Sequence, residues 1–80
     1  MIEVFKTNVN SEAESRKIIT AIRDYNPHYF PNFDLQDEDR ILRVLCPGQV
    51  INVDEIISLV RSHGYDADIL IDEIASVRRN

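Results

Sequence analysis

The most restrictive feature of this sequence is a proline inside a segment that otherwise has the composition of a β-strand. Residues 29–35 (Tyr-Phe-Pro-Asn-Phe-Asp-Leu) are rich in aromatic residues, and Phe33 and Leu35 share one face with Pro31. A proline has no backbone N–H and cannot complete a hydrogen-bond ladder on both sides of a strand. We therefore predict that this strand lies at the edge of its sheet or contains a bulge.

Three further strands are predicted at residues 2–7, 40–46 and 65–70 from their β-branched and aromatic content. The alternation in 40–46 predicts one face with Leu42, Val44 and Cys46, and an opposite face with Ile41, Arg43 and Leu45. The phase of the first strand stays open, because Val4 and Phe5 are both apolar and only one of them can face the core.

Two amphipathic helices are predicted between these strands. The first covers residues 12–25 and ends before Pro27, because proline disfavours helical geometry in the residue that precedes it. The second follows Asn52, a favourable N-cap, and ends at Gly64, which adopts left-handed geometry easily. The predicted inner stripes are Ile18, Ile22 and Tyr25 in the first helix, and Val53, Ile56, Val60 and His63 in the second.

The loop between the first strand and the first helix ends in Ser11-x-x-Glu14, which has the form of a capping box. In that motif the Ser11 hydroxyl accepts a hydrogen bond from the Glu14 amide, and the Glu14 carboxylate reaches back to the Ser11 amide. These residues therefore predict a well-defined start for the first helix.

Composition limits the classes of partner. The chain has 80 residues, enough for one small domain at residues 1–70 with a tail at 71–80 that forms a short helix or frays. The formal net charge of −5 disfavours nucleic acid and anionic membranes, and no apolar run is long enough to span a bilayer. The lone cysteine and the absence of a signal-peptide pattern lead us to expect a cytoplasmic protein.

The order β-α-β-β-α-β predicts an α+β fold, the ferredoxin-like split-βαβ sandwich. Its four-stranded antiparallel sheet has the order 4-1-3-2, with both helices on one face, and places the second strand at an edge as Pro31 requires. The other face of the sheet is then open, and we expect Phe30, Ile41 and Leu45 there, with Val4 as a further candidate. Apolar residues on an open face predict a protein partner, a homodimer or coverage by residues 71–80.

This chain resembles the heavy-metal-associated (HMA) domain family of copper chaperones and copper-transporting ATPases, most clearly in its second half. The resemblance covers residues 2–70 and is carried by three segments: Phe33-Asp34-Leu35-Gln36-Asp37, Ile41-Leu42-Arg43-Val44 and His63-Gly64-Tyr65-Asp66-Ala67. The last of them matches the Gly-Tyr-x-Ala sequence that follows the second helix in the family. The resemblance implies the same ferredoxin-like fold.

The sequence departs from the family where the family binds its metal. Family members carry Met-x-Cys-x-x-Cys in the loop before the first helix; the corresponding positions here are Val9, Ser11 and Glu14. Copper(I) prefers soft thiolate ligands, which a hydroxyl and a carboxylate do not replace. The resemblance therefore implies an HMA-like domain without the thiolate Cu(I) site and without a cofactor, acting by binding another protein or itself.

An alternative is a metal site with non-thiolate ligands. Glu14 and His63 are the candidate ligands for Zn(II) or Cu(II), and Asn8, Asn10 and Tyr65 are expected at the same end of the fold. The competing interpretation of His63 is a partly buried imidazole hydrogen-bonded at a helix C-terminus.

Enzymatic activity is the least supported class. His28 is predicted to lie on the surface and Cys46 to be a buried apolar residue, so neither forms a nucleophile–base pair. The only glycines, Gly48 and Gly64, do not make a phosphate-binding loop.

Overall fold

The computed structural model describes residues 1–70, so the predicted tail at 71–80 lies outside the described residues. The elements are β1 (Ile2–Thr7), α1 (Glu12–Tyr25), β2 (Phe30–Asp34), β3 (Ile41–Leu45), α2 (Val53–Ser62) and β4 (Ala67–Ile69). The predicted order is confirmed, and β1 and α1 have the predicted bounds. β2 and β3 are each one residue shorter at both ends than predicted, and β4 contains only three residues. None of the described helices is long and apolar enough to cross a membrane.

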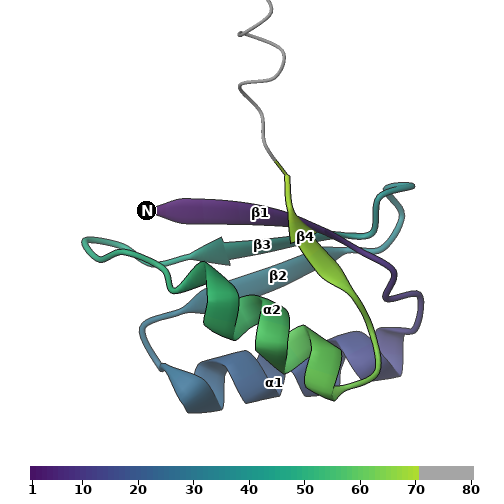
Figure 1. Cartoon of the computed structure of the whole chain (residues 1–80), viewed down its shortest axis with the longest axis horizontal. Coiled ribbons are helices and arrows are strands. Elements are labelled where there is room, and N and C mark those ends of the chain that lie inside the picture. Colours follow the sequence, from purple (N-terminus) through teal and green to yellow (C-terminus); the bar gives the residue numbers. More distant parts are fainter. Residues whose placement is uncertain (71–80) are drawn as a thin grey trace, which may run out of the picture.

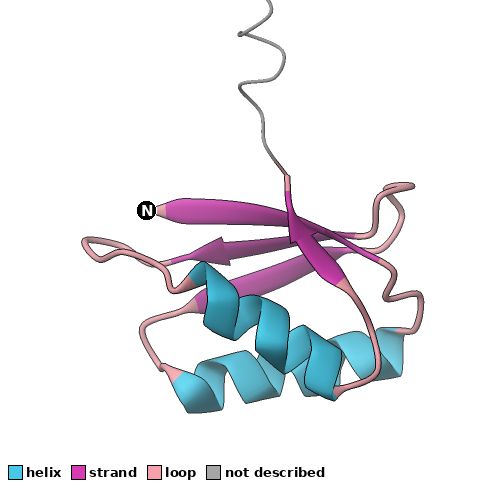
Figure 2. Cartoon of the chain, viewed as in Figure 1, coloured by secondary structure: helices cyan, strands magenta, loops and turns pink. Residues whose placement is uncertain are grey.

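The four strands form one antiparallel sheet in the order β2-β3-β1-β4, and both helices pack on the same face (Figures 1 and 2). This is the predicted ferredoxin-like topology. Pro31 lies in β2, which pairs only with β3 and is an edge strand, as its missing N–H requires. The short β4 forms the other edge.

The hydrophobic core lies between the sheet and the two helices. Phe5 is fully buried and pairs with Leu42 in the β1–β3 register, which settles the phase of β1 and places Val4 on the open face. Among residues 1–70, the largest fully buried side chains are Phe5, Val9, Ile18, Ile22, Leu42, Val44, Cys46, Ile56 and Val60. The predicted burial of Cys46 is confirmed.

The prediction for the last turn of α1 was wrong. Tyr25 is 45% exposed, and the buried stripe of α1 instead consists of Ser15, Ile18 and Ile22. The aromatic residue that enters the core at this end of the molecule is Tyr29, whose hydroxyl accepts a hydrogen bond from the Asn52 amide at 2.9 Å. This bond joins the start of β2 to the N-cap of α2.

The open face of the sheet also differs from the prediction. Ile41 belongs to this face by alternation along β3, but it is only 4% exposed. It is the first residue of β3 and is paired with Asp34 of β2, and the Lys6 ammonium lies 4.0 Å from Asp39 in the turn before β3. Leu45 and Phe30 are exposed as predicted, and Ile2 is exposed beside them.

Candidate functional site

The site that the sequence singles out is the loop between β1 and α1, residues 8–11. Its first support is Thr7, whose side chain is buried at the end of β1. The Thr7 hydroxyl donates to the Arg40 carbonyl at 2.6 Å and accepts from the Val9 amide at 3.2 Å. The Thr7 amide donates to the Asp39 carbonyl at 3.0 Å. The loop therefore begins from a point that is fixed to the turn before β3.

The second support comes from the far end of the chain. The Asn8 side-chain oxygen accepts a hydrogen bond of 2.8 Å from the amide of Asp66, which lies 58 residues away, just before β4. Val9 is fully buried in the core. The loop is therefore anchored by the hydrogen bond of Asn8 to the segment before β4 and by the packing of Val9 in the core.

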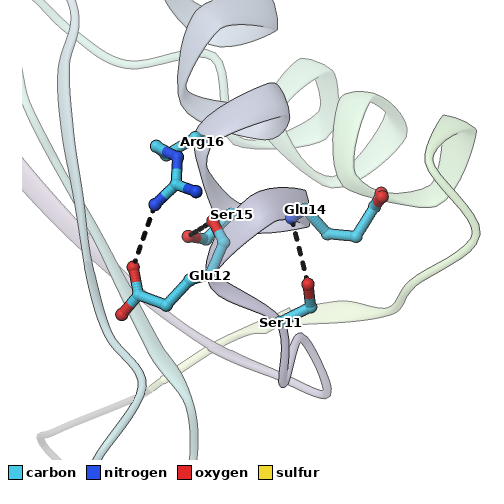
Figure 3. Close-up of polar contacts among 5 residues, drawn as sticks. All are labelled: Ser11, Glu12, Glu14, Ser15 and Arg16. Atoms are coloured by element: carbon cyan, nitrogen blue, oxygen red, sulfur yellow. Dashed lines mark hydrogen bonds and ion pairs between the residues drawn. The ribbon is translucent and has the colours of Figure 1, made fainter.

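The loop ends at Ser11, the N-cap of α1 (Figure 3). The Ser11 hydroxyl accepts from the Glu14 amide at 3.3 Å, as predicted. The reciprocal half of the capping box does not form: the Glu14 carboxylate instead pairs with Lys17 at 3.2 Å. Glu12 forms a similar pair with Arg16 at 3.5 Å, and the Ser15 hydroxyl donates to the Glu12 carbonyl at 2.7 Å. The polar side chains of Ser11, Glu12, Glu14 and Ser15 thus all have partners within α1 and its N-cap.

His63 caps the C-terminus of α2 and is half-buried. Its Nδ1 lies 2.9 Å from the Leu59 carbonyl, which can only accept a hydrogen bond, so Nδ1 carries the proton. This is the helix-end histidine that the sequence predicted as the alternative to a ligand. In the neutral ring the lone pair is then on Nε2.

The remaining residues proposed for this end of the fold differ in their surroundings. Tyr65 packs against the core and Asn10 is exposed. Among residues 1–70, no group of three or more histidine, cysteine, aspartate or glutamate side chains is close enough to hold a metal ion.

The other candidates lie away from this loop. His28 is exposed in the turn between α1 and β2, as predicted. The buried Cys46 thiol lies 3.9 Å from the Gln49 side-chain oxygen, just after β3. The pKa of the Tyr25 phenol is raised, first by partial desolvation and then by the nearby Glu55 carboxylate.

Sequence reasoning did not find the bonds that fix the loop. Thr7 was assigned only to a strand, and Asn8 only to the loop end. Asparagine at a strand end commonly accepts a backbone hydrogen bond, but the donor 58 residues away gives no local signal.

Two solved structures are similar to this chain. The yeast copper transporter domain CCC2A, determined in its apo and Cu(I)-loaded states, has a TM-score of 0.71 and 19% identity over 89% of this chain and 96% of its own. The fold of this chain is that of copper-binding domains. A copper-binding domain from HMA7, a P-type ATPase, has a TM-score of 0.70 and 18% identity over 90% of this chain and 96% of its own. No protein-family model and no curated protein matches the sequence.

Proposed function

We propose that this chain is a non-enzymatic, HMA-like domain that has lost the thiolate Cu(I) site and acts by binding another protein or itself. The observation that carries the proposal is the chemistry of the first turn of α1. The residues at the two positions assigned to cysteines, Ser11 and Glu14, cap the helix and pair with Lys17.

The ligand chemistry supports the loss of the copper site. A Cu(I) site of the family type needs two thiolates within one helical turn, and the chain has a single cysteine. Cys46 is fully buried just after β3, and its thiol faces Gln49. A hydroxyl and a carboxylate are hard ligands with little affinity for Cu(I), so copper transfer by the family mechanism is not expected.

The exposed apolar residues support a role in protein binding. Ile2, Phe30 and Leu45 are each about half-exposed on the face of the sheet that the helices leave open. Isolated exposed apolar residues are ordinary, but a continuous set on one face marks an interaction surface. The fixed loop at residues 8–11 offers a second rigid surface at the opposite end of the strands.

Calorimetric titration of the purified protein tests the metal half of the proposal. We expect no heat of binding with Zn(II) or Cu(II), and no removal of Cu(I) from a competing chelator. A micromolar Zn(II) or Cu(II) site that disappears in Glu14→Ala would contradict the proposal and establish the non-thiolate alternative. Glu12→Ala is the matched control, because Glu12 is an exposed carboxylate in the same turn.

A further inference from the structure

We draw no further inference here: the strongest candidate, the patch of half-exposed apolar side chains Ile2, Leu45 and Phe30 on the open face of the sheet, carries nothing because the exposed Arg43 lies on the same face two residues from Leu45 and no feature of residues 1–70 shows what covers the patch.

Discussion

Restoring two thiols at the start of α1 tests the assignment of Ser11 and Glu14 to the metal-ligand positions. In the double variant Ser11→Cys/Glu14→Cys, two thiolates lie at the N-cap and third position of a helix whose entry loop is already fixed by Asn8 and Thr7. We expect this variant to bind Cu(I), which the wild type is not expected to do. Soft thiolates and a helix N-terminus that stabilises them both favour the ion.

The double variant should be less stable than the wild type without metal and more stable once it has bound Cu(I). Losing the Ser11 cap costs about 1 kcal/mol, and losing the Glu14–Lys17 pair with its favourable charge near the helix start costs up to about 1 kcal/mol more. For a domain of this size, each kcal/mol lowers Tm by about 4–8 °C. A ligand present at a thousandfold its dissociation constant stabilises the folded state by about 4 kcal/mol. Copper(I) should therefore more than recover the lost Tm.

Thermal unfolding under anaerobic conditions, with and without Cu(I) held by a chelator, measures both the loss of Tm in the metal-free variant and its recovery on Cu(I) binding. The single variants Ser11→Cys and Glu14→Cys are matched controls, because each supplies one thiol while Cys46 stays buried. A folded double variant that takes up Cu(I) no better than the single variants would refute the placement of these two residues at the ligand positions.

Three further changes test the contacts that fix the fold. Tyr29→Phe should destabilise the protein by about 1–3 kcal/mol, because it leaves the Asn52 amide without its acceptor; urea unfolding measures the change, and Tyr25→Phe is the exposed control. Thr7→Val should cost a similar amount, about 1–3 kcal/mol, and should speed hydrogen exchange at the Val9 amide, whose acceptor is removed. Gly64→Ala should lower stability by about 1 kcal/mol, because φ at Gly64 is +88° and a side chain there is strained even though nothing lies within 4 Å of the added Cβ; an unchanged urea midpoint would contradict that reasoning.

Features with a local physical cause were predicted well from the sequence. The N-caps Ser11 and Asn52 were identified correctly because side-chain capping depends on residues three positions apart. Pro31 identified the edge strand because a proline has no backbone N–H to donate, and this limits its strand to an edge or a bulge whatever the rest of the sheet contains. Together with the order of elements, these signals were enough for the topology.

Features that depend on packing between distant segments were missed. Tyr25 and Tyr29 are both aromatic and lie near the same chain reversal, but Tyr29 is the buried one, and its hydroxyl accepts from the amide of Asn52, the N-cap of α2. Ile41 has the alternation of an exposed residue but is only 4% exposed, and alternation along one strand does not indicate what packs over a residue. For the candidate site, the cap at Ser11 was predictable. The pairing of Glu14 with Lys17 was not, because the Glu14 carboxylate can reach either the Ser11 amide or the Lys17 ammonium.

Pro31 has a consequence for how copies of this chain can associate. A sheet edge with free N–H and C=O groups is a template for the open-ended strand addition that leads to aggregates. Here one edge strand contains a proline and the other, β4, is only three residues long. Neither edge is a good template, so growth by strand addition is disfavoured on both sides of the sheet.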